Sequence, residues 1–230
     1  MLDPTEIKVM LSAAFKEAYL ELVPEFERTT GNKVTSLWVP SVKIMNRLQD
    51  GETVDIVILS AASLDELIRL GLVAKKGRYD LARSGIGAAV RTGAPKPDLS
   101  SGEALRRAVV AAKSIVYSTG PSGIYLAGLF SRMGIAEEIK TKVKQVQGEP
   151  AGAVVARGEA EIGFQQISEL LPVPGIDLVG PLPPDVQEIT VFSAGVHVAS
   201  KAPDAARALI KCFIAPDAAP VIRRKGLEPI

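Results

Sequence analysis

Short apolar stretches alternate with helix-periodic segments in the first third of this chain, and this alternation limits the fold more than any other feature. Strands are predicted at Ile7–Leu11, Val34–Val39 and Asp55–Leu59, and helices at Ala13–Arg28, Ser41–Leu48 and Ser63–Leu70. A continuous apolar run is typical of a strand that is buried on both faces of a parallel sheet. The β-α-β-α-β-α order therefore predicts an open, parallel α/β sheet with helices on both faces.

The rest of the chain predicts a second α/β unit and a return to the first. Strands are expected at Ile86–Val90, Ser114–Tyr117 and Ile162–Phe164, with helices at Ser101–Ala112, Ile124–Met133, Glu137–Val143 and Pro150–Arg157. A proline-rich connection at 172–184 contains one short strand, and Ile189–Ala199 is a long strand that precedes two closing helices. We expect one lobe from 1–82 plus 190–230 and another from 83–189, with hinges near 82–86 and 184–190.

Charge and composition exclude several classes of protein. The 27 Lys and Arg residues nearly balance the 26 Asp and Glu residues, so no basic excess indicates nucleic-acid binding. The single cysteine, Cys212, excludes an internal disulfide, and the single histidine, His197, excludes a His-rich metal site. His197 lies in a predicted strand, where a structural role is more common than catalysis. No metal and no cofactor is predicted.

Small hydroxyl-rich turns follow the predicted strands, at the strand ends where α/β sheets bind ligands. They are Leu11-Ser12-Ala13-Ala14, Val39-Pro40-Ser41, Leu59-Ser60-Ala61-Ala62-Ser63 and Ser118-Thr119-Gly120-Pro121-Ser122-Gly123. Free N–H groups at a helix start favour an anion, and hydroxyl groups add hydrogen bonds. Each serine alone is equally explained as a helix N-cap. Together the four turns predict a site for a small anion.

The turn at Gly120–Gly123 matches neither common nucleotide-binding pattern. It lacks the Gly-Lys-Ser/Thr ending of a phosphate-binding loop and the G-x-G-x-x-G spacing of a dinucleotide site. Glu17, Glu21 and Glu25 have helical spacing and indicate a solvated helix face rather than a pair of catalytic carboxylates. A nucleotide-using enzyme and a glycosidase are therefore not expected.

Five segments in order resemble the molybdate-binding, ModA-like periplasmic proteins of the type 2 periplasmic binding fold. They are IKVMLSAAFKEAYLELVPEFERTTGNKV, PSVKIMNRLQDGETVDIVILSA, PSGIYLAGLFSRMGI, VVARGEAEIGFQQ and APDAARALIKCFIAPDAAPVIRRKGLEP. The resemblance covers Ile7 to Pro229. It implies a two-lobed protein that captures an anion in an interlobe cleft, works with an ABC-type permease, and is a periplasmic monomer. The sequence predicts no secretory signal within this chain, because no basic and apolar leader precedes Ile7.

The resemblance also implies which positions bind the anion. The family's first serine falls on Ala14, with Ser12 two residues earlier, and its second falls on Ser41. Its backbone donors fall on Ser60, Ser122 and Gly148, and its site-closing tyrosine on Gln166. Losing a serine and a tyrosine while gaining Gln165 and Gln166 favours a larger, more polar anion such as a small organic acid.

Two functions from different classes remain open. The first is a solute-binding protein without a catalytic residue, for which Arg83 is either a carboxylate clamp near the first hinge or a surface arginine. The second is a cofactor-independent isomerase, because aconitate isomerase resembles this group and moves a proton between carbons of a tricarboxylate. Such an enzyme requires a general base. Lys16, Glu17 and Glu149 are the candidates.

Overall fold

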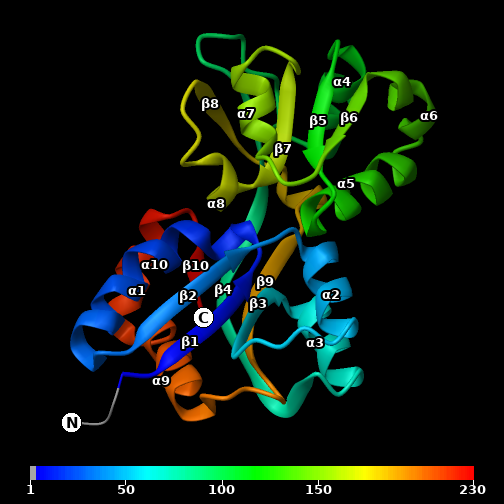
Figure 1. Ribbon diagram of the computed structural model, residues 1–230. Coiled ribbons are helices and arrows are strands. Elements are labelled where there is room, and N and C mark those ends of the chain that lie inside the picture. The colour runs from blue at the N-terminus through cyan, green and yellow to red at the C-terminus, as the bar shows by residue number, and fades with distance from the viewer. Residues whose placement is uncertain (1–3) are drawn as a thin grey trace. The chain divides into compact units, whose positions relative to one another are not determined.

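The computed structural model describes residues 4–230, in which strands and helices alternate along most of the chain (Figure 1). The chain divides into unit 1, which is the chain up to Arg83 together with Val191–Ile230, and unit 2, Ser84–Thr190. The strands are β1 (Glu6–Leu11), β2 (Lys33–Trp38), β3 (Ile56–Ser60), β4 (Val73–Arg91), β5 (Ile115–Ser118), β6 (Val143–Val146), β7 (Ile162–Gln166), β8 (Ile176–Pro181), β9 (Ile189–His197) and β10 (Glu228–Pro229). The helices are α1 (Lys16–Thr30), α2 (Ser41–Gln49), α3 (Ala61–Arg69), α4 (Gly102–Ala111), α5 (Pro121–Arg132), α6 (Ala136–Ile139), α7 (Ala151–Ala156), α8 (Ile167–Leu170), α9 (Pro203–Phe213) and α10 (Ala219–Arg224).

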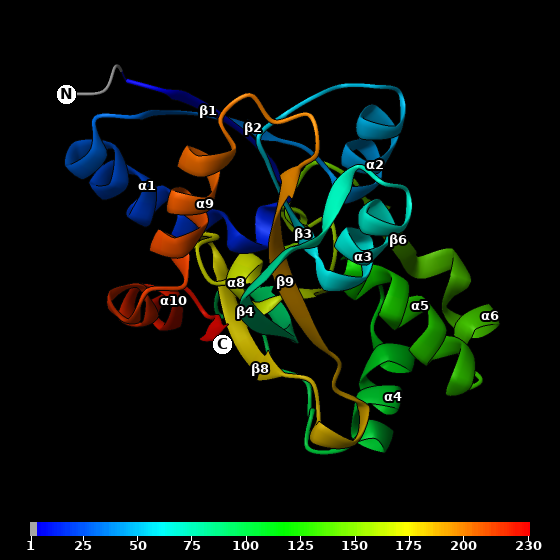
Figure 2. The ribbon, with the colours of Figure 1, turned by 90° about the horizontal axis from the view of Figure 1, so that it is seen from below.

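The strands of unit 1 run in the order β2-β1-β3-β9, with the first part of β4 next to β9. β1 is parallel to both β2 and β3, whereas β9 is antiparallel to β3. Side chains alternate between the two faces of these strands. Val9 and Leu11 join the core under α1 and α9, and Met10 joins the core under α2 and α3. Figure 2 shows these helix pairs on opposite sides of the strands.

The strands of unit 2 run in the order β4-β7-β5-β6, and β8 also pairs with β4. β5 is parallel to β6 and β7, and β4 is antiparallel to β7 and β8. Phe164 packs in the core shared with α4 and α5, whereas Val116 packs against α7 on the other face. Both units are thus open α/β sheets with helices on both faces, as the sequence predicts. They are mixed rather than parallel, because β9 and β4 run antiparallel to their neighbours.

Two predicted elements differ from the structure. The strand expected at Ile86–Val90 is the end of the 19-residue strand β4, which begins at Val73. The helix expected at Glu137–Val143 ends at Ile139, and strand β6 begins at Val143. β6 is held by parallel pairing to β5, with Ser118 opposite Val146. Pairing between distant segments, rather than a local pattern, determines this strand.

Candidate functional site

The carboxyl ends of three strands meet at one edge of unit 1. Leu11, the last residue of β1, is opposite Trp38 in β2 and Ile58 in β3. The next residues continue this contact, because Ser12 N–H donates to the Ile58 carbonyl (3.2 Å) and Val39 N–H donates to the Leu11 carbonyl (3.1 Å). The predicted residues Ser12, Ala13, Ala14, Ser41 and Ser60 therefore gather at this edge, which we call edge 1.

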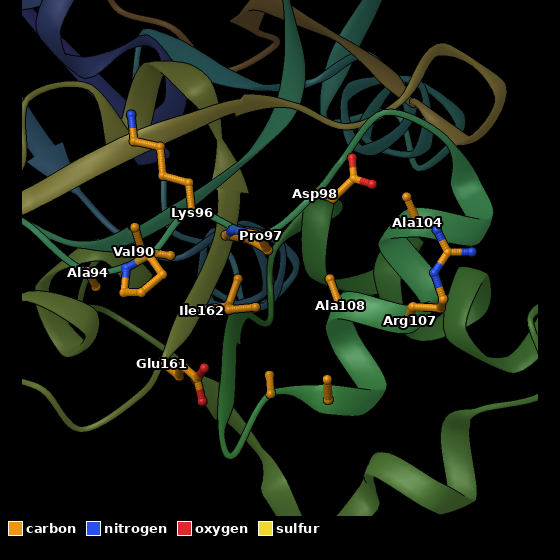
Figure 3. A pocket seen from close by; sticks show the side chains of 13 residues that line it. Val90, Ala94, Lys96, Pro97, Asp98, Ala104, Arg107, Ala108, Glu161 and Ile162 are labelled. Carbon is orange, nitrogen blue, oxygen red and sulfur yellow. The ribbon is translucent and has the colours of Figure 1, made fainter.

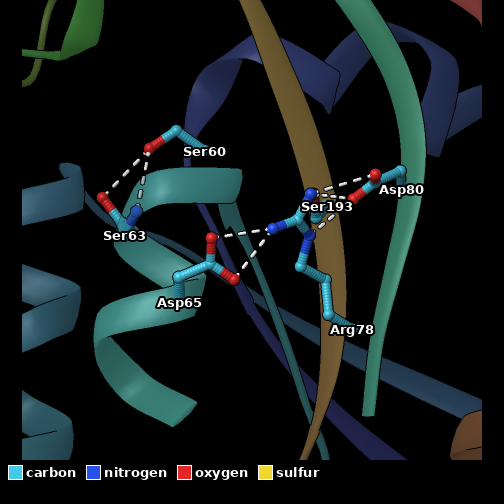
Figure 4. A network of polar contacts seen from close by, with 6 residues as sticks. All are labelled: Ser60, Ser63, Asp65, Arg78, Asp80 and Ser193. Atoms are coloured by element: carbon cyan, nitrogen blue, oxygen red, sulfur yellow. Dashed lines mark hydrogen bonds and ion pairs between the residues drawn. The ribbon is translucent and has the colours of Figure 1, made fainter. Parts of the chain in front are cut away.

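The three serines of edge 1 have different surroundings. Ser60 is the N-cap of α3, and its hydroxyl lies 3.0 Å from the Ser63 hydroxyl (Figure 4). Ser12 is buried without a side-chain capping bond. Ser41 was expected as an N-cap, but Pro40 occupies the cap and Ser41 is the first residue of α2. Ala14 is buried and Ala13 is exposed. The Ser41 hydroxyl is thus not used in capping α2.

Lys16 brings a positive charge to edge 1. It is the first residue of α1, and its Nζ lies 5.6 Å from the ring centroid of Trp38, the last residue of β2. Both side chains are half-buried. Among residues 4–230, no carboxylate forms an ion pair with Lys16. A cation–π contact at a strand end leaves the ammonium free to bind an anion.

A partly exposed polar network fixes α3 to the neighbouring strands. Arg78 donates to both oxygens of Asp65 at 2.8 Å and to both oxygens of Asp80 at 2.7 and 3.0 Å. Ser193 of β9 also donates to Asp80, at 2.7 Å (Figure 4). The Arg78 bonds lower the pKa of Asp80 and the carboxylates raise that of Arg78. This network therefore has a structural role in holding α3 against the strands. Arg83, five residues along β4, is exposed.

The parallel strands of unit 2 also end at one edge. Ser118 at the end of β5 is opposite Val146 of β6, and Tyr117 is opposite Phe164 of β7. The predicted residues Ser122, Gly148 and Gln166 lie just beyond or at these strand ends. Gly148 is exposed with φ +86°, which favours glycine, whereas Ser122 and Gln166 are each 1 % exposed. We call this set of strand ends edge 2.

The start of α5 approaches the end of β5 very closely. A Cβ atom at Gly123 would lie 1.6 Å from the Ser118 carbonyl oxygen, so only glycine fits. Gly120 is the N-cap of α5, and its N–H donates to the Ser118 hydroxyl at 3.2 Å. The sequence Gly-Pro-Ser-Gly is therefore explained by helix packing as well as by ligand binding.

Two adjacent glutamines, Gln165 and Gln166, are the last residues of β7. Gln165 Oε1 accepts from the Ala151 N–H at the start of α7 (2.7 Å), and its Nε2 donates to Glu169 Oε1 of α8 (2.9 Å). Gln166 Nε2 bonds to the Thr190 hydroxyl at 3.0 Å, while Gln166 Oε1 and the Ser168 hydroxyl are buried with no partner among the described residues. Burial raises the pKa of Glu169 to about 7, although the Gln165 bond acts in the opposite direction.

The three predicted candidates for the general base lie in different surroundings. Glu149 forms an ion pair with Arg157 at 3.0 Å, and Glu17 is half-buried in the first turn of α1. Lys16 is the cation of edge 1 described above. Sequence reasoning did not select Glu169, because its position depends on Ala151, which is distant in sequence. Tyr125 donates to the Val186 carbonyl at 2.9 Å and so has a packing role.

His197 and a cavity of unit 2 both lie away from these edges. His197 is 4 % exposed, and its Nδ1 accepts from the Ala199 N–H at 3.1 Å. A cavity of about 430 Å³ lies near the amino ends of β5 and β7, where Ala112, Glu161 and Ile162 line it (Figure 3). Within residues 4–230 no cluster of three His, Cys, Asp or Glu side chains is arranged to hold a metal ion. None of the described helices is long and apolar enough to span a membrane.

The chain belongs to the bacterial extracellular solute-binding protein family, whose model matches residues 7–228. Two curated proteins are similar to it along most of their length. An aconitate isomerase of a Pseudomonas species is 42% identical over 232 residues, with 98% of this chain and 88% of that protein covered. The molybdate-binding protein ModA of Azotobacter vinelandii is 26% identical, with 96% and 89% covered.

Solved structures agree with this family. The periplasmic molybdate-binding protein of Azotobacter vinelandii has a TM-score of 0.79 at 17% identity, covering 96% of this chain and 98% of that one. The sulfate-binding protein SubI of Mycobacterium tuberculosis has a TM-score of 0.78 at 16% identity, covering 98% and 87%. The predicted ModA-like resemblance and the two-lobed type 2 binding-protein fold are confirmed.

Proposed function

We propose that this protein binds a small tricarboxylate and interconverts the isomers of aconitate without a cofactor. The observation that carries the proposal is the 42% identity to an aconitate isomerase over 98% of the chain, against 26% to a molybdate-binding protein. This reverses the order of the two functions that the sequence left open.

The chemistry of the two edges supports an organic acid over a compact oxyanion. Edge 1 offers hydroxyl groups, helix-start N–H groups and the Lys16 ammonium, all of which suit carboxylates. Edge 2 offers amide groups where the molybdate-binding family has a tyrosine. We propose Ser12, Ala13, Ala14, Ser41, Ser60, Arg83, Ser122, Gly148 and Gln166, with Lys16, as the binding residues.

An NMR time course tests the proposal directly. Purified protein is incubated with trans-aconitate, and separately with cis-aconitate, in deuterated water. We expect each isomer to give the other, with deuterium at the carbon that receives the proton only to the extent that the abstracted proton exchanges with solvent before it is returned. A wild-type protein that leaves both isomers unchanged contradicts the proposal. Boiled protein measures the uncatalysed conversion.

A second function, capture of an anion for an ABC-type importer, is favoured by the family description and by a structural neighbour. That neighbour is a substrate-binding domain of a putative molybdenum ABC transporter from Clostridium difficile. A thermal-shift panel with molybdate, tungstate, sulfate, citrate and both aconitates separates the two functions. A ligand at about 100 times its Kd stabilises by roughly 2.7 kcal/mol. Stabilisation by molybdate or tungstate alone favours capture; a tricarboxylate response alone favours the isomerase. In both cases we propose a periplasmic monomer.

A further inference from the structure

Glu169 is an ionisable group whose surroundings at edge 2 differ from those of a surface glutamate. It lies on α8, which begins directly after β7, and its side chain is half-buried. Gln165 holds one carboxylate oxygen, Oε1, at 2.9 Å and is itself held by the Ala151 N–H at 2.7 Å. Oε2 accepts no hydrogen bond from the described residues. The carboxylate is thus oriented through one oxygen and free at the other.

No opposite charge from the packed elements neutralises this carboxylate. α8 packs on β7 and α7, and neither Ile162–Gln166 nor Ala151–Ala156 contains a charged residue. The charged residues that flank α7, Glu149 and Arg157, form an ion pair with each other. Burial therefore dominates and brings the pKa of Glu169 to about 7, where both protonation states are populated at neutral pH. This is the condition that favours a general acid–base.

Two buried polar groups beside Glu169 lack partners. Gln166 is 1 % exposed and Ser168 is 2 % exposed, and Gln166 Oε1 and the Ser168 hydroxyl have no hydrogen-bond partner among the described residues. Leaving such groups buried and unpaired is unfavourable. The Thr190 hydroxyl can donate or accept, so the Gln166 amide can turn over, keep this bond and offer its NH₂ instead. Both residues can then donate to a carboxylate.

We propose that Glu169 takes the proton from the substrate's methylene carbon and returns it to the other allylic carbon. The inference rests on the proposed isomerase function. In the first half, a C–H bond breaks, Glu169 becomes a carboxylic acid, and the electron pair spreads over the allylic carbons and their carboxylates. In the second half, a C–H bond forms at the former vinylic carbon and Glu169 is again a carboxylate. The double bond moves by one position, and no co-reactant is consumed.

The variant Glu169→Gln tests this role because the neutral amide retains the shape and the bond to Gln165. We expect kcat for cis-aconitate to fall by about 100-fold or more, the range for losing a general base. Thermal stabilisation by cis-aconitate is expected to persist within about threefold in Kd. The wild-type kcat/KM is expected to rise with pH through about 7, as the carboxylate forms. Glu138→Gln, an exposed glutamate of the same unit, is the matched control.

Each result supports or overturns the inference. Glu169→Gln with kcat within threefold of an active wild type overturns it, and so does a loss that lies in KM alone. If this variant does not fold, the wild-type profile decides, since a kcat/KM that stays constant from pH 8 to pH 6 excludes a base of this kind. A wild-type protein that unfolds cooperatively on heating and yet isomerises neither aconitate overturns the proposed function itself, and the inference on Glu169 falls with it.

Discussion

The two edges use the same strand-to-helix geometry but different chemistry. Edge 1 has serine hydroxyls, alanines at the start of α3 and the Lys16 ammonium over Trp38. Edge 2 has the amides of Gln165 and Gln166 and a half-buried glutamate. A site made only for capture needs no group that titrates near neutral pH. Under the proposed function, edge 1 would hold the negative charge of the substrate and edge 2 would handle the proton.

The largest effect is expected where edge 2 is sterically tightest. Gly123→Ala places a Cβ atom 1.6 Å from the Ser118 carbonyl oxygen, so α5 must shift away from β5. We expect a loss of about 3 kcal/mol in unfolding free energy, the upper end for overpacking. Chemical denaturation followed by circular dichroism measures it. Edge 1 has Ala61 and Ala62 at the corresponding helix start, so this constraint belongs to edge 2.

The matched control for Gly123→Ala is Gly128→Ala on the same helix. Its added Cβ would meet only the flexible end of Arg132, at 3.4 Å. Because alanine is the better helix former, we expect a gain of about 0.5–1 kcal/mol. Equal effects of the two substitutions would show that helix propensity, and not the approach to Ser118, determines this turn.

The next effect tests edge 1 as the part that holds charge. Lys16→Gln removes its cation, and we expect the Kd for citrate to rise about tenfold, which is about 1.4 kcal/mol. The chain has one tryptophan, and Trp38 lies under the Lys16 ammonium, so its fluorescence reports binding directly. Lys33→Gln, an exposed lysine at the opposite end of β2, is the control. Equal Kd values for both variants would remove Lys16 from the site.

The third effect tests whether Gln165 tunes the proton-handling group of edge 2. Gln165→Met removes the hydrogen bond that lowers the pKa of Glu169, so burial acts alone and the pKa rises further. The rise of kcat/KM with pH should move to higher pH. A bond of about 0.5–1.5 kcal/mol shifts the pKa by about 0.4–1.1, which corresponds to roughly twofold to sevenfold less activity at pH 7. An unchanged midpoint, with Gln49→Met as the exposed control, would contradict this coupling.

The fold was predictable from sequence where patterns are local. The apolar run Asp55–Leu59 and the helical periodicity of the segments beside it indicate burial directly. The α/β class and the positions of both edges could therefore be predicted. The first half of β4 was missed because it carries Lys75, Lys76 and Arg78 and has no apolar run. Glu169 was missed for a different reason. A glutamate's hydrogen bonds to a neighbouring glutamine, and the distant N–H that fixes that glutamine, exist only after folding.

The smallest expected effect is the pH dependence of unfolding free energy that comes from His197. Burial lowers the pKa of His197 in unit 1, and the charge of Asp55 opposes this only in part. Below about pH 6.5 the unfolded chain binds a proton that the folded chain excludes, so stability falls as pH decreases. The slope for one group is at most about 1.4 kcal/mol per pH unit. Urea unfolding followed by Trp38 fluorescence at pH 7.5 and 5.5 measures it in unit 1.

The variant His197→Gln is expected to remove this loss at pH 5.5, and it is a clean test because the chain has one histidine. Glu169→Gln should act in the opposite direction. A raised glutamate pKa means that the folded state holds the extra proton between about pH 4.5 and 7, so wild-type stability from this group decreases as pH rises. If both variants changed the pH dependence of stability with the same sign, the contrast between the titrating groups of the two units would be wrong.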